Sequence, residues 1–120
     1  VIIIQIETVA ALENVEQIAQ VDGVDIIMMG PGDLSLQLGI PGEFNHPTIQ
    51  AATERIAAAA NRFGKHWGRP VGSVDEAKKY LDMDARFITY GADIVTIKAA
   101  HEKMQSDYSK LGFTFDNRLA

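Results

Sequence analysis

Two carboxylate side chains in the first third of the sequence, Glu7 and Asp33, lie at or just after the end of an apolar segment. The segments, residues 1–7 and 24–29, are short and rich in β-branched side chains, which favours strands over helices. Successive parallel strands end at the same edge of a sheet, so we expect both carboxylates at that edge. Two hard oxygen ligands in such a place predict a site for a divalent metal ion.

Each carboxylate also has a simpler structural interpretation. Glu7 would favour the positive end of a following helix, and Asp33 would cap a helical turn that starts at Leu34. The neighbouring glycines favour a binding role, because Gly30 and Gly32 allow close approach of the backbone and leave the amides of Gly32 and Asp33 available to an anion. A metal ion beside such amides suits a substrate that carries a carboxylate.

Gln5 lies two residues before Glu7 and therefore on the same side of the first strand. An amide among aliphatic neighbours is costly unless it is hydrogen-bonded. Its side chain either reaches the cavity next to Glu7 or makes a structural hydrogen bond inside the sheet, and the sequence leaves both alternatives open.

The other reactive side chains form weaker patterns. His46, His66 and His101 do not have the spacing of metal ligands, and we expect them to cap helices or lie at the surface. No lysine lies inside an apolar strand, where burial would lower its pKa for imine formation, so a Schiff-base mechanism is disfavoured. Trp67 and Arg69 fall in a third predicted strand and line either a cavity or the core.

The elements that position these residues alternate between strand and helix. We predict strands over residues 1–7, 24–29, 66–71 and 86–90, and helices over residues 9–20, 34–38, 47–63, 74–81 and 94–111. The helix starts are marked by Thr8, Pro47, Ser73 and Asp93. Asp84 stands where a glycine would follow a helix, and Asp tolerates positive φ better than most residues. Four such β-α units predict an α/β fold with a mainly parallel sheet, half of a (β/α)8 barrel.

The composition fits one globular domain over residues 1–120. The chain is 47% hydrophobic and carries a net charge of -5, which disfavours nucleic acid and anionic membranes as partners. It contains no cysteine, which excludes thiolate catalysis and fits a cytoplasmic protein. The sequence begins inside a Val/Ile run without a Met, so we expect a truncated N-terminus, with upstream sequence supplying the neighbouring strand.

Several short motifs form one combined pattern: QIET at 5–8, LENVEQI at 12–18, VDGVD at 21–25, GPGDLS at 30–35, LG at 38–39 and, more loosely, GAD at 91–93. This pattern resembles the HpcH/HpaI family of metal-dependent 2-oxo-acid aldolases, and the chain would be the second half of that family's TIM barrel. The resemblance implies that Glu7 and Asp33 hold Mg2+ or Mn2+. It also implies that Gln5, Gly32 and Asp33 contact the bound pyruvate.

The implied reaction is reversible aldol cleavage of a 4-hydroxy-2-oxo acid to pyruvate, or a related 2-oxo acid, and an aldehyde. Such reactions serve the catabolism of aromatic compounds. The family's substrate-binding Arg and its proton-transferring His belong to the first half of the barrel, so we expect this chain alone to be nearly inactive. The resemblance also implies self-association into a homo-oligomer, because the family places its last helix against a neighbouring subunit.

Three alternatives remain open. A citrate-lyase β-subunit-like or malyl-CoA-lyase-like protein resembles this chain in fold and in its carboxylate pair but cleaves acyl-CoA substrates; that group usually has an aromatic residue where Leu34 stands. A non-catalytic half-barrel would fold by associating with a partner or with itself. A flavodoxin-like binding module would need a phosphate loop after the first strand, and residues 8–10 offer none.

Overall fold

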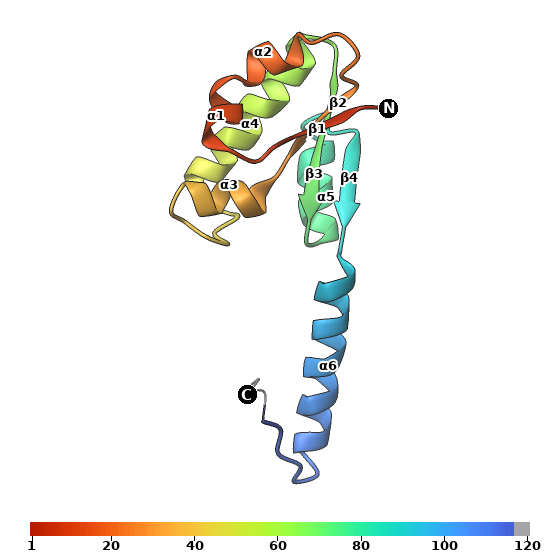
Figure 1. Cartoon of the computed structure of the whole chain (residues 1–120). Helices are drawn as coiled ribbons and strands as arrows, with labels where there is room; N and C mark the ends of the chain where they lie inside the picture. The colour runs from red at the N-terminus through yellow and green to blue at the C-terminus, as the bar shows by residue number, and fades with distance from the viewer. Residues whose placement is uncertain (117–120) are drawn as a thin grey trace. The chain divides into compact units, whose positions relative to one another are not determined.

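Within residues 1–116, which the computed structural model describes, four parallel strands form one sheet in the order β1-β2-β3-β4 (Figure 1). The strands are β1 (Ile3–Ile6), β2 (Ile26–Met29), β3 (His66–Val71) and β4 (Phe87–Tyr90). The helices are α1 (Val9–Glu13), α2 (Val15–Ala19), α3 (Pro31–Gln37), α4 (Pro47–Arg62), α5 (Val74–Leu81) and α6 (Asp93–Ser109). The predicted α/β class with a parallel sheet is confirmed.

The chain divides into two compact units, Val1–Tyr90 and Gly91–Ala120. The first unit contains the sheet and helices α1 to α5, and the second contains α6, which has no buried residue. The single domain expected over residues 1–120 stays a prediction. In the part of the chain that the structure describes, no helix is both long and apolar enough to cross a bilayer.

Helices cover one face of the sheet in the first unit. On this face Ile6, Ile27 and Trp67 are fully buried, with α4 packed over β2 and β3 and α5 packed on β3. The alternate residues Ile3 and Met28 keep part of their surface in solvent. Side chains alternate between the faces of a strand, so this burial pattern places the core between the sheet and its helices.

Trp67 and Arg69 belong to this core and do not line a cavity. The Nε1 of Trp67 donates to the carbonyl of Met83 at 3.1 Å, and its ring makes an edge contact with Tyr80. The guanidinium of Arg69 donates from Nη1 to Oγ1 of Thr53 at 3.0 Å and lies 4.3 Å above the Tyr80 ring. Burial lowers the pKa of Arg69, and only 1% of the residue is exposed.

Most predicted helix boundaries agree with the structure. Thr8 caps α1, Pro47 is the first residue of α4 and Ser73 caps α5, each as its residue type predicts. Asp84 adopts a φ of 66°, which confirms the left-handed position expected after α5.

The predicted boundaries of the first and last helices are wrong. The helix expected over residues 9–20 divides at Asn14, where Nδ2 of the side chain donates to the carbonyl of Ala10 at 2.8 Å and the backbone leaves the helical region. The last helix has Ala92 as its N-cap, so Asp93 is its first helical residue, and the Asp93 carboxylate accepts from the N–H of Ile94.

Candidate functional site

The carboxyl ends of β1 and β2 bring Glu7 next to Gly30. The strand register pairs Ile6 with Met29, so the residues that follow these two are neighbours across the strands. The N–H of Gly30 donates to the carbonyl of Ile6 at 2.9 Å and extends this pairing. Asp33 comes next, in the first turn of α3. Both acidic residues therefore follow the ends of neighbouring strands, and their convergence on one metal ion stays a prediction.

Gln5 is hydrogen-bonded to Glu7. Its Nε2 donates to Oε2 of the Glu7 carboxylate at 2.9 Å. Both alternatives predicted for Gln5 meet in this contact. The amide makes a structural hydrogen bond, and its acceptor is the candidate metal ligand Glu7. The bond engages one carboxylate oxygen and leaves the other, Oε1, for a ligand. Among the ion pairs of residues 1–116, none involves Glu7 or Asp33.

Gly30 has no room for a side chain. A methyl carbon at this position would lie 2.7 Å from Nε2 of Gln5 and 2.8 Å from Cβ of Glu7. Gly32 differs, because no atom lies within 4 Å of the corresponding position. The close approach predicted for both glycines is therefore found at Gly30 and not at Gly32. The side chains that approach Gly30 are those of the hydrogen-bonded residues Gln5 and Glu7.

Helix α3 begins earlier than predicted and contains most of the GPGDLS motif at residues 30–35. Gly30 is the N-cap, Pro31 is the first helical residue and Asp33 lies in the first turn, so the prediction that Asp33 caps a turn from Leu34 is wrong. Proline is favoured at this first position because the N–H it lacks would have no partner there. The Asp33 carboxylate lies at the positive end of α3, and the first-turn amides of Gly32 and Asp33 have no acceptor inside the helix.

Two polar side chains that the sequence did not single out, Ser35 and Gln37, fix α3 against its neighbours. Ser35 is fully buried; its Oγ donates to the carbonyl of Gly32 at 2.7 Å and accepts from the N–H of Gly42 at 3.1 Å. Oε1 of Gln37 accepts from the N–H of Val9 at 3.0 Å, which ties α3 to the start of α1. The Ser35–Gly32 bond is local to α3, whereas the bonds to Gly42 and Val9 reach other segments, so no local pattern predicts them.

The histidines add no ligand to this site. His46 caps α4, with its Nδ1 accepting from the N–H of Thr48 at 3.2 Å, as expected. Across residues 1–116, no three side chains of His, Cys, Asp or Glu form a group that could hold a metal ion. The candidate donor set is therefore the two carboxylates of Glu7 and Asp33, which leaves most positions around an octahedral ion to water and substrate.

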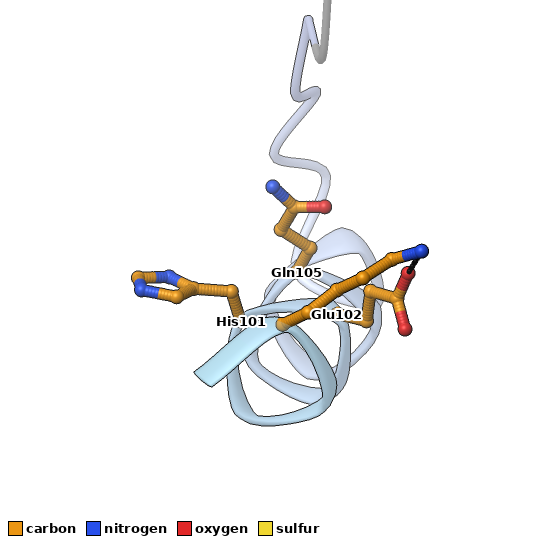
Figure 2. Close-up of a pocket in the computed structure, with 4 residues that line it drawn as sticks. His101, Glu102 and Gln105 are labelled. Carbon is orange, nitrogen blue, oxygen red and sulfur yellow. Dashed lines mark ion pairs between the residues drawn. The ribbon is translucent and has the colours of Figure 1, made fainter. Parts of the chain in front are cut away.

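An open depression of about 360 Å³ lies on α6, and neither Glu7 nor Asp33 lines it. It is lined by Lys98, His101, Glu102 and Gln105. Figure 2 shows the side chains of His101, Glu102 and Gln105 projecting from this one helix, and Lys98 pairs with Glu102 at 3.7 Å. A surface formed by one exposed helix, whose acidic group is already paired, has no enclosed space for a substrate.

Comparison with known proteins gives consistent matches over most of the chain. The family model described as HpcH/HpaI aldolase/citrate lyase matches residues 1–100. The chain is 36% identical over 109 residues to 5-keto-4-deoxy-D-glucarate aldolase of Klebsiella pneumoniae, which is 91% of this chain and 43% of that protein. It is also 36% identical over 107 residues to 4-hydroxy-2-oxo-heptane-1,7-dioate aldolase of Escherichia coli, covering 89% of this chain and 41% of that protein.

The solved structures agree. An HpcH/HpaI aldolase/citrate lyase family protein from Burkholderia cenocepacia matches with a TM-score of 0.77 and 32% identity, over 89% of this chain and 42% of that one. The chain spans less than half the length of the relatives it matches. This coverage and the parallel sheet confirm the predicted half of a TIM barrel. The chain belongs to the HpcH/HpaI aldolase/citrate lyase family.

Proposed function

We propose that this chain supplies the second half of a divalent-metal-dependent aldolase that cleaves 4-hydroxy-2-oxo acids to pyruvate and an aldehyde. One observation carries the proposal: Gln5 holds the carboxylate of Glu7 at the end of β1, beside the helix turn that contains Asp33. The relatives from Klebsiella pneumoniae and Escherichia coli are named as aldolases, which supports carbon-carbon cleavage.

The donor set suits Mg2+ or Mn2+. Glu7 and Asp33 offer hard oxygen ligands, and their two negative charges balance a divalent cation. In the described residues no lysine or arginine pairs with either carboxylate. When bound, the ion would supply Lewis acidity toward the carboxylate and ketone oxygens of the substrate.

The residues of this chain would bind and orient the 2-oxo acid. The amides of Gly32 and Asp33, at the positive end of α3, suit the substrate carboxylate. Gln5 gives one N–H to Glu7 and keeps a second N–H and its amide oxygen for the substrate. None of these groups is suited to transfer the proton that pyruvate formation needs, so that step would fall to the first half of the barrel.

The completed barrel, defined as this chain joined to a first barrel half, provides the test. That half comes, as a chimera, from the Klebsiella pneumoniae aldolase. Removing divalent metal with EDTA should lower pyruvate release from a 4-hydroxy-2-oxo acid by about 100-fold or more, and Mg2+ or Mn2+ should restore it. Release that persists without metal would contradict the proposal.

The same assay separates the alternatives. Cleavage of acyl-CoA substrates in place of 4-hydroxy-2-oxo acids would favour a citrate-lyase β-subunit-like or malyl-CoA-lyase-like enzyme. Leu34 argues for the aldolase, because it is fully buried where that group usually has an aromatic residue. Metal binding without any turnover would indicate a non-catalytic half-barrel.

We also propose that the protein is a cytoplasmic homo-oligomer that acts on small molecules and does not bind nucleic acid or membranes. Helix α6 carries exposed apolar side chains at helical spacing, namely Ile94, Ile97, Met104 and Tyr108. A stripe of this kind is typical of a helix that packs against a partner. Light scattering of the 120-residue chain should give at least twice its mass of 13.1 kDa, and Met104→Lys should lower it. A wild-type mass of one copy would contradict self-association.

A further inference from the structure

We infer that Gly30 is a positioning residue of the site. Its missing side chain allows Gln5 and Glu7 to stay hydrogen-bonded, and that bond engages Oε2 of Glu7 and leaves Oε1 to a cation. The metal in this inference rests on the proposed function, whereas the hydrogen bond rests on geometry alone.

Space, and not backbone conformation, excludes a side chain at Gly30. Its φ is -102°, which any residue can adopt. A methyl carbon there would lie 2.7 Å from Nε2 and 3.1 Å from Cγ of Gln5, and 2.8 Å from Cβ of Glu7. Carbon atoms in good contact are about 3.5 to 4.0 Å apart, so these neighbours would have to move.

The backbone of Gly30 cannot easily retreat from the pair. Its N–H is bonded to the carbonyl of Ile6 at 2.9 Å, and its own carbonyl accepts from the N–H of Leu34 at 3.2 Å. The residue is buried and caps α3. The strain of an added methyl therefore falls on Gln5 and on Cβ of Glu7. The Gln5 side chain is exposed and can rotate into solvent, which breaks its bond to Glu7, whereas Cβ of Glu7 is fixed to the backbone and has to shift with it.

Losing this bond should weaken metal binding without removing a ligand. A carboxylate held by an outer hydrogen bond is already oriented, and loss of such a partner typically costs about 10- to 100-fold in metal affinity. Gln5→Ala removes this contact alone, and Gly30→Ala should weaken binding at least as much, because it removes the same contact and also displaces Cβ of Glu7.

Gly72 offers a matched control. It follows the last residue of β3 as Gly30 follows the last residue of β2. A methyl carbon at Gly72 would lie 3.6 Å from Oε2 of Glu76, which is an ordinary contact. Gly72→Ala thus adds the same methyl group at an equivalent strand end without a collision.

The dissociation constant of Mn2+, measured by electron paramagnetic resonance of the free ion in the completed barrel, tests the inference. Gly30→Ala and Gln5→Ala should each raise it by about 10- to 100-fold, and Gly72→Ala by less than about threefold. The dissociation constant of the double variant should lie within about threefold of that of the single variant that binds Mn2+ less tightly, because the two changes act through one bond. Wild-type affinity in Gly30→Ala, or multiplied effects in the double variant, would overturn the positioning role.

A metal-free measurement separates this inference from the proposed function. In the 120-residue chain, nuclear magnetic resonance should show slower water exchange for the side-chain amide of Gln5 than for that of exposed Gln17. Gly30→Ala should abolish the difference, and Gly72→Ala should preserve it, with circular dichroism confirming that each variant folds. An unchanged Gln5 amide in Gly30→Ala would overturn the inference even if metal binds. The wild type could instead fail to bind Mn2+ while Gly30→Ala still abolishes the slow exchange of the Gln5 amide. That result would overturn the proposed function and the positioning role that rests on it.

Discussion

Glu7→Gln in the completed barrel is expected to lower metal-dependent pyruvate release by about 100- to 1000-fold. The substitution keeps the size of the side chain but removes one of the two negative charges that would balance a divalent ion. The new amide has only one oxygen, which can accept from Nε2 of Gln5, as Oε2 of Glu7 does at 2.9 Å, or bind the ion, but not both. The site would thus lose one negative charge and, in addition, either a ligand or the bond that orients it.

Glu54→Gln is the control for this loss of charge. Glu54 lies exposed on α4 and is not among the residues placed at the site, so its variant should keep wild-type turnover. Urea unfolding should show both variants within about 1 kcal/mol of the wild type, because neither replaces a fully buried group. Wild-type turnover by Glu7→Gln would rule out a role for this carboxylate in holding the metal.

Gly68→Ala is expected to destabilise the 120-residue chain by about 3 kcal/mol or more. Gly68 lies opposite Phe87 in the β3–β4 ladder, and a methyl carbon there would collide with the Phe87 carbonyl oxygen. A backbone carbonyl cannot rotate away as a side chain can. The strands would have to separate, with loss of ladder hydrogen bonds that each contribute about 1 kcal/mol.

Urea unfolding at 25 °C measures the change in the free energy of unfolding. Gly72→Ala is the control, because it adds the same methyl group directly after the last residue of β3. The control methyl would make only an ordinary contact, so its stability should stay within about 1 kcal/mol of the wild type. Equal stability of the Gly68 and Gly72 variants would show that β3 and β4 do not pair in this register.

The sequence predicts the alternation of elements because the punctuation is strong. Strand β3 has the predicted ends, His66 and Val71, since Gly64 precedes it and Gly72 with Ser73 follows it. The capping residues Thr8 and Ser73 are recognisable from their types alone, because their oxygens satisfy amides within the next turn.

The same local rules fail where two structures compete for one segment. Gly30 to Asp33 reads as a loop from its glycines, yet Pro31 starts α3, as Pro47 starts α4. The break at Asn14 is invisible to apolar periodicity, because residues on both sides keep helical spacing while the Asn14 side chain bonds to the backbone.

The candidate site is predictable in part. The two-residue spacing predicts that Gln5 and Glu7 lie on one side of the first strand, but the sequence leaves open the hydrogen bond that joins them in the structure. The role of Gly30 was not predictable, because it depends on which residue of β1 lies beside it. That register is fixed by pairing and burial of whole strands and has no local sequence pattern.

The central claim is that Glu7 and Asp33 share one divalent ion. Anomalous diffraction from crystals of the completed barrel grown with Mn2+ tests it most directly. We predict a single strong peak at the carboxyl ends of β1 and β2, with one carboxylate oxygen of Glu7 and one of Asp33 within about 2.5 Å of the ion. A Mn2+ ion bound by only one of these side chains, or by neither, would contradict the account.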